Sequence, residues 1–319
     1  MSSTATSNLR GVLAALVAFG IFATHDVAVK TLGGYYAPFH IIFFSVLLTY
    51  PLVALMLLHD AKADNLRPKH PRWTALRTSS IVVSGLCTFY AFSVLPLAQV
   101  YAILFASPLV ITVLSIPILG EVVRLRRGLA VLVGLGGVLI VLRPGSAELQ
   151  PGHLAAMIGA IFSGLASVVV RKIGRDERSA VLLLYPLTAN FVVMACALPF
   201  VYEPMPVEHL GLIAIVASFA FIAGLFLIAA YRMAEAAMVA PMQYSQILWA
   251  TAYGYFFFEE LPDQGTLIGA GVIIASGLYI VLRESRGNSA NNPVLETRTR
   301  WATPTMPRIS AWLRLRDSK

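Results

Sequence analysis

Long apolar stretches alternate with short polar segments along nearly the whole chain. A helix that crosses a bilayer needs about 20 mostly apolar residues. Ten stretches of suitable length are present, at residues 10–31, 39–58, 77–95, 97–119, 126–142, 152–172, 180–202, 210–230, 235–258 and 264–283. The pattern therefore predicts an all-α integral membrane protein with ten transmembrane helices, whose surroundings are the lipid bilayer.

Composition supports this environment. Of the 319 residues, 58% are hydrophobic and 13% are charged, and that charged share is about half of what a soluble domain carries. Cys87 and Cys196 lie in apolar stretches and have no metal-ligand spacing. No phosphate-binding loop or nucleophile motif is visible. We therefore expect no metal, no cofactor and no enzymatic activity.

Basic residues predict the orientation in the membrane, because lysine and arginine gather on the cytoplasmic side. With a cytoplasmic N-terminus, only Lys30 and Arg143 of the 24 basic residues fall outside. Residues 1–9 then form a cytoplasmic N-terminus, and residues 284–319 form a flexible basic cytoplasmic tail. The net charge of +8 thus reflects membrane topology, and we expect no nucleic-acid partner.

The two halves of the chain resemble each other. Residues 11–33 align with residues 152–174, and the ends of the fifth and tenth spans match as well. This predicts two repeats of five helices, at 10–143 and 152–283. Because five is odd, the repeats cross the membrane in opposite senses, and such inverted repeats suit alternating access in a carrier.

The chain also resembles the ten-helix EamA-type branch of the drug/metabolite transporter superfamily. The residues that carry the resemblance are Asp26-x-x-x-Lys30, Leu95-Pro96-Leu97-Ala98, Gly120-Glu121, Pro241 and Glu259-Glu260. The resemblance implies a secondary transporter with a central cavity lined largely by helices 1, 3, 4, 6, 8 and 9. It also implies two cytoplasmic termini, here in a bacterial inner membrane.

Asp26 is the only acidic residue well inside a predicted span, and an ionisable residue there marks a functional site by default. In the repeat, Lys30 aligns with the basic Arg171, so we interpret both as structural, whereas Asp26 aligns with Ser167. We assign Asp26 and its neighbour His25 to the substrate site. The alternatives are a Lys30–Asp26 pair one helical turn apart and a simple hydrogen bond from His25 to a neighbouring helix.

The ninth span carries further candidates for substrate binding. Gln246, Trp249 and Tyr253 share one helical stripe, with Gln243 and Tyr244 beside them. The alternative is that these polar groups join helices to each other.

Weaker candidates are Tyr90 and Tyr101 in the third and fourth spans. Pro108 and Pro241 are expected to bend their helices, because proline lacks the backbone N–H that continues a helix.

These residues favour a carrier of a small organic metabolite. Amide groups beside aromatic rings suit a planar heteroaromatic solute such as riboflavin, and no arginine that would bind a carboxylate is evident in mid-membrane. Export of amino acids or aromatic metabolites is the main alternative, and a polytopic membrane enzyme or lipid-handling protein is the alternative of another class. The direction of transport, the coupling ion and the oligomeric state, with a homodimer as one option, are left open.

We predict that a reporter fused after Lys319 is active only in its cytoplasmic form, since the basic residues place both termini on that side. Paired fusions of alkaline phosphatase and a fluorescent protein measure this. A periplasmic C-terminus would contradict the count of ten spans.

Overall fold

The computed structural model describes residues 2–58, 66–120, 125–143, 150–174, 176–177, 179–233 and 239–286. Every regular element in these ranges is a helix. Their order is α1 (Ser2–Gly33), α2 (Pro38–Leu58), α3 (Pro71–Val94), α4 (Leu97–Leu104), α5 (Ser107–Leu119), α6 (Leu125–Leu142), α7 (Pro151–Ile173), α8 (Ser179–Val201), α9 (Val207–Met233), the 3₁₀ segment η1 (Ala240–Ser245), α11 (Gln246–Phe258) and α12 (Gln264–Arg286).

Within the described ranges these elements form ten apolar segments when α4 is joined to α5 and η1 to α11. Seven of the ten are long and apolar enough to cross a membrane on their own length, and the helical stretches 128–142 and 264–280 are shorter apolar ones. The helical membrane architecture expected from the apolar pattern is therefore present. The predicted tail at 284–319 lies almost wholly outside the described residues.

Two of the ten segments are broken by proline. The fourth is interrupted at residues 105–106, directly before Ser107 and Pro108. Pro108 has no N–H for the carbonyl of Leu104, and the Ser107 hydroxyl donates to that carbonyl instead, at 2.7 Å. The ninth segment begins as η1, with Pro241 in its first turn, although the Pro241 side chain itself lies outside the described part.

The predicted start of the third span was wrong. The third span was expected to begin at residue 77, but α3 begins at Pro71. Proline is favoured in the first turn of a helix, where its missing N–H is not needed. The helix therefore starts in a polar stretch, and Arg77 lies in its second turn and not in a loop.

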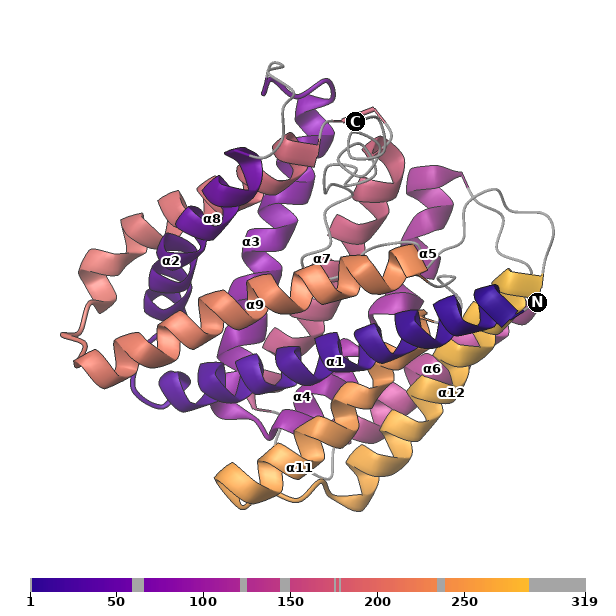
Figure 1. Cartoon of the computed structure of the whole chain (residues 1–319). Coiled ribbons are helices and arrows are strands. Elements are labelled where there is room, and N and C mark those ends of the chain that lie inside the picture. Colours follow the sequence, from indigo (N-terminus) through magenta and orange to yellow (C-terminus); the bar gives the residue numbers. More distant parts are fainter. Residues whose placement is uncertain are drawn as a thin grey trace.

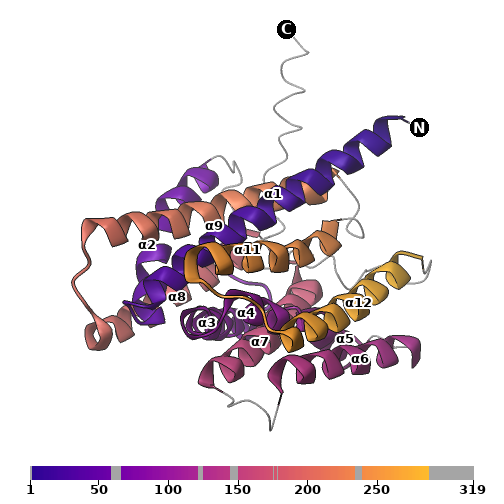
Figure 2. The same ribbon diagram turned by 90° about the horizontal axis from the view of Figure 1, so that it is seen from below.

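Packing partners come from opposite halves of the chain. α1 packs along α9 and α3 along α7, while α2 packs on α8 and α6 on α12. α1 and α9 run side by side in Figure 1, and α6 and α12 form a separate pair (Figure 1). Seen from below, α3 and α4 lie between α1 and α9 on one side and α5, α6 and α7 on the other (Figure 2).

Consecutive segments alternate in direction, so their connections gather at two ends of the bundle. We call one the hairpin end; it holds the connections 34–37, 95–96, 202–206 and 259–263, together with the end of α6 at Arg143 and the beginning of α7 at Pro151. The other, the terminal end, holds the beginnings of α1, α3 and α8 and the last turn of α12.

Close contact between α6 and α12 depends on two glycines. A Cβ added at Gly137 would lie 2.9 Å from the carbonyl oxygen of Gly269, and one added at Gly269 would lie 2.6 Å from the carbonyl oxygen of Gly137. Small residues that let two backbones approach are a common basis of helix association in bilayers. Gly271, two residues further along α12, has no described atom within 4 Å of such a Cβ.

We predict that Gly269→Leu destabilises the protein by roughly 1–3 kcal/mol, because the added side chain forces the two backbones apart. Gly271→Leu is the matched control and should melt like the parent. Thermal unfolding in detergent measures both. Equal melting temperatures for the two variants would contradict the packing assigned to Gly269.

Candidate functional site

A cavity of about 270 Å³ lies in the middle of the bundle. Its lining comes from α1, α3, α4 with α5, α7, α9 and η1 with α11, which are the first, third, fourth, sixth, eighth and ninth segments of the chain. These are the six helices that the family resemblance implies. α2 and α8 also contribute. Most of the wall is apolar. The polar and charged residues that line it are His25, Asp26, Ser45, Thr49, Arg77, Ser84, Thr88, Tyr101, Ser107, Ser163, Ser167, Asn190, Gln243 and Gln246.

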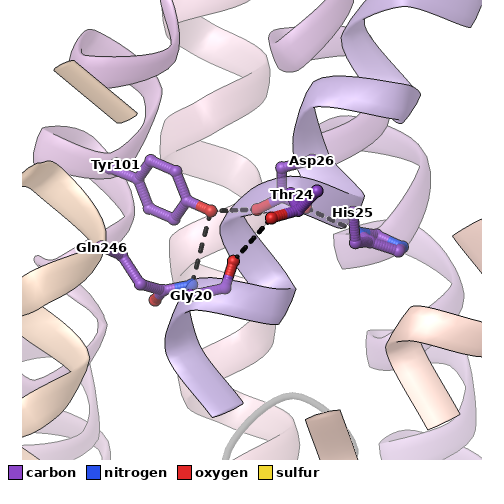
Figure 3. Close-up of polar contacts among 6 residues, drawn as sticks. All are labelled: Gly20, Thr24, His25, Asp26, Tyr101 and Gln246. Carbon is purple, nitrogen blue, oxygen red and sulfur yellow. Dashed lines mark hydrogen bonds and ion pairs between the residues drawn. The ribbon is translucent and has the colours of Figure 1, made fainter. Parts of the chain in front are cut away.

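Asp26 is the centre of a polar network in this wall. Its side chain is only 2% exposed. The hydroxyl of Tyr101, on α4, donates to Asp26 Oδ2, and Nδ1 of His25 lies 2.8 Å from Asp26 Oδ1. Gln246, the first residue of α11, donates its amide N–H to the Tyr101 oxygen at 3.4 Å (Figure 3). Three segments far apart in the sequence thus meet at one carboxylate.

This arrangement holds a carboxylate where the dielectric is low. Removing a charge from water is costly unless it is paired or hydrogen-bonded, and within a membrane such groups characteristically line substrate or ion pathways. The Tyr101 hydroxyl supplies one hydrogen bond. A cationic group in the cavity would add the opposite charge, so the site is chemically suited to bind a cation.

Five of the nine predicted substrate residues line the cavity: His25, Asp26, Tyr101, Gln243 and Gln246. The other four do not. Tyr90 is exposed on α3, and Tyr244 is buried edge-on against Phe105.

Trp249 and Tyr253 pack against a different face of α1 from the one that lines the cavity. Trp249 is 39% exposed, and its indole lies over Gly20. The Tyr253 hydroxyl is 3.1 Å from Thr24 Oγ1. Gly20 and Thr24 are one turn apart on α1 and face these rings, whereas Asp26 faces the cavity.

Lys30 holds the hairpin end together. It donates to the carbonyl oxygen of Leu95 at 2.6 Å and forms an ion pair with Glu260 at 2.9 Å. These contacts tie α1 to the α3–α4 connection and to the α11–α12 connection, which belongs to the other half. The structure thus gives Lys30 partners other than Asp26. The side chain of Arg171, its predicted counterpart, lies outside the described part.

A second ion pair lies at the same end, between Arg143 and Asp263 at 2.6 Å. Asp263 also accepts the backbone N–H of Thr266 in the first turn of α12, at 3.0 Å. The Thr266 side chain, above all, holds the pKa of Asp263 below its usual value, and the Arg143 charge acts in the same direction. Asp263 is therefore the N-terminal cap of α12.

Sequence reasoning missed Arg77. The sequence predicts that the third span begins at residue 77, which makes Arg77 one of the basic residues on the cytoplasmic side and not a cavity residue. In the structure its side chain is 8% exposed and lines the cavity. Pro71 was the available signal, because proline favours the first turn of a helix and Arg77 is the sixth residue after it.

A family model matches the chain twice, at residues 9–143 and 150–282, and its description is EamA-like transporter family. The chain belongs to this family. The two matches together cover most of the 319 residues. This EamA-like protein is therefore a multi-pass membrane transporter and not an enzyme.

Known relatives agree with that assignment. The EamA-like protein is 24% identical over 293 residues to an S-adenosylmethionine uptake transporter of Rickettsia prowazekii, covering 92% of this chain and 99% of the relative. It is 26% identical to the transporter of the same name in Rickettsia bellii, covering 84% and 91%. A pseudopaline exporter of Pseudomonas aeruginosa is 25% identical, covering 87% and 97%. These relatives indicate a small-metabolite transporter.

A solved crystal structure shares the fold. It superimposes with a TM-score of 0.58 at 20% sequence identity, covering 89% of this EamA-like chain and 99% of the other.

We predict that Tyr101→Phe and Asp26→Asn are energetically coupled. Tyr101→Phe removes the hydroxyl that donates to Asp26, and Asp26→Asn removes the charge that strengthens this hydrogen bond, so the double variant should lose less stability than the two singles combined. Coupling of about 0.6–1.7 kcal/mol is typical of helix-bridging hydrogen bonds in membranes. Thermal unfolding of the four proteins gives the value. Tyr185→Phe, at an exposed position on α8, is the control, and its loss of stability should simply add to that of Asp26→Asn. If the losses of Tyr101→Phe and Asp26→Asn also simply add, the coupling is contradicted.

Proposed function

We propose that this transporter moves a zwitterionic, amino-acid-derived metabolite with a cationic group across the bacterial inner membrane. The observation that carries the proposal is the buried carboxylate of Asp26 in the cavity wall, hydrogen-bonded by Tyr101. A carboxylate in a cavity within the membrane attracts a solute cation, and such residues characteristically line substrate pathways. The relatives named as S-adenosylmethionine uptake transporters support S-adenosylmethionine, whose sulfonium is such a cation, as the first compound to test.

Transport proceeds by alternating access between two inverted repeats. Two features support this part of the proposal. The family model matches each half separately. The helix pairing is also reciprocal: the first helix of each half packs on the third helix of the other, as α1 does on α9 and α7 on α3. Two equivalent halves give two states of similar energy, each open to one side of the membrane.

The hairpin end faces the periplasm in this proposal, and both termini are cytoplasmic. The basic residues support that orientation, because Lys30 and Arg143 alone among them lie at the hairpin end of the predicted topology. The Lys30–Glu260 pair then joins the two halves on the periplasmic side. Opening the cavity to that side requires its separation.

Riboflavin stays a prediction from the sequence. It rested on stacking by Trp249 and Tyr253, and neither residue lines the cavity. Its amide partners Gln243 and Gln246 do line the cavity, so riboflavin belongs in the same transport panel. Export of amino acids remains the alternative, and the pseudopaline exporter among the relatives supports including the export direction.

We predict that proteoliposomes containing the purified protein take up radiolabelled S-adenosylmethionine faster than liposomes without protein. Asp26→Asn should reduce the initial rate by about 10-fold or more, because one charge-assisted interaction contributes about 1.5–3 kcal/mol. Unlabelled amino acids and riboflavin serve as competitors in the same assay.

Thr24→Val is the matched control. It removes a hydroxyl from α1 within two residues of Asp26, but Thr24 bonds Gly20 and Tyr253 and does not line the cavity. Its rate should stay near that of the parent. Uptake by Asp26→Asn at the parent rate would refute the role of Asp26, and competition by riboflavin alone would favour the heteroaromatic substrate.

A further inference from the structure

Arg77 is a second charged group in the cavity wall. It lies on α3 near the terminal end, whereas Asp26 lies toward the hairpin end, and the side chains of both are buried. The α3 residues that line the cavity run from Arg77 to Phe92, a length of roughly 22 Å at 1.5 Å per residue. The cavity therefore carries a positive group toward one end and a negative group toward the other.

Part of the role of Arg77 is structural. Its Nη1 donates to the carbonyl oxygen of Leu182 on α8, at 2.6 Å. Leu182 lies four residues before Pro186, which has no N–H to bond that carbonyl. In a bilayer such a freed carbonyl needs a donor from elsewhere in the protein. Arg77 supplies it and joins α3 to α8.

The hydrogen bond to Leu182 uses only Nη1 of the guanidinium and gives no role to its other nitrogen atoms or to its charge. Among the described residues, Nε of Arg77 is buried without a hydrogen-bond partner. None of the ion pairs found in the described ranges includes Arg77. A neutral donor would serve the Leu182 carbonyl equally well, whereas a permanent charge in this place is expensive without an anion. Within the described residues no anion pairs with Arg77, and the cavity is where a solute would bring one.

We propose that Arg77 forms a carboxylate-binding subsite at the terminal end of the cavity, which binds the carboxylate of the transported metabolite. The guanidinium fork matches a carboxylate with two parallel hydrogen bonds, and Nη1 alone is committed to Leu182. This rests on the proposed function and specifies its substrate further: the carboxylate of the zwitterion binds at Arg77, and its cationic group binds at Asp26 at another position along the cavity.

Hydroxyl groups line the wall between the two charges. Ser84 and Thr88 follow Arg77 along the cavity face of α3, and Ser163 and Ser167 lie on the facing helix α7. Side chains of this kind hydrogen-bond a polar solute without fixing a charge. The distance along α3 is too long for one small zwitterion to contact both charges at once, so the solute occupies the Arg77 subsite and the Asp26 subsite one after the other. Arg77 is therefore a separate subsite that the carboxylate occupies on the terminal side.

The test compares S-adenosylmethionine with its decarboxylated analogue, which keeps the sulfonium and lacks the carboxylate. Equilibrium binding of both to the purified full-length protein gives a ratio of dissociation constants. We expect the parent to prefer the carboxylate compound by about 10-fold or more. Arg77→Gln should bring the ratio close to one, and Arg77→Lys should give an intermediate ratio, because lysine keeps the charge but not the planar fork.

Two variants separate this subsite from its alternatives. Asp26→Asn should weaken the decarboxylated analogue, which depends on the Asp26 subsite alone, and should not lower the ratio. Arg72→Gln, at an exposed position on the same helix, should change neither constant. Arg77→Lys also retains a donor for Leu182, so its melting temperature shows whether folding is preserved.

The outcomes separate the two proposals. A parent protein that binds neither compound overturns the proposed substrate class and this subsite with it. A parent that binds both, with the same ratio in Arg77→Gln as in the parent, overturns the carboxylate subsite alone. A change in melting temperature at Arg77 without a change in the ratio means that the residue only holds α8.

Discussion

A bilayer offers no water to the polar groups of a polypeptide, so each backbone carbonyl and N–H in the membrane must find its partner within the protein. The helices satisfy this requirement except where proline interrupts them. At Pro108 the partner of the freed carbonyl is the Ser107 hydroxyl, and at Pro186 it is the Arg77 guanidinium. Both prolines line the cavity. At these two prolines the interrupted backbone bonding therefore lies beside the cavity.

The same requirement governs the charged side chains. Lys30 is placed against the Leu95 carbonyl and Glu260 at the end of its helix, so it holds the bundle together without entering the cavity. Asp26, one turn earlier on α1, faces the cavity and is held by Tyr101. Two ionisable residues four positions apart therefore serve different purposes. Their difference comes from what the neighbouring helices bring to each of them.

Much of the fold followed from the sequence, because the thickness of a bilayer fixes the length of a spanning helix. Broken helices at Pro108 and Pro241 followed from the chemistry of proline. The start of α3 was missed because the apolar pattern ends at the charged residue Arg77, whereas the helix itself continues through charged residues back to Pro71. For the same reason Arg77 was not recognised as a cavity residue.

The site was harder to predict than the fold. Helical periodicity places Gln246, Trp249 and Tyr253 on one stripe, but it does not say against what that stripe packs. Here Trp249 and Tyr253 meet the Gly20 and Thr24 face of α1, while Gln246 reaches Tyr101. Such contacts depend on how helices cross, which is a property of the packed bundle and not of any single segment.

The opposite charges of Asp26 and Arg77 have an electrical consequence. Their formal charges sum to zero, so in the alternating-access cycle that we propose, the return step of the empty carrier moves no net charge of this pair through the membrane voltage. The voltage then acts only on the net charge of the solute, with about 2.3 kcal/mol per elementary charge at 100 mV. A solute with a net positive charge would be drawn toward the negative cytoplasm without a coupling ion. For a solute of zero net charge, the concentration gradient alone would set the direction.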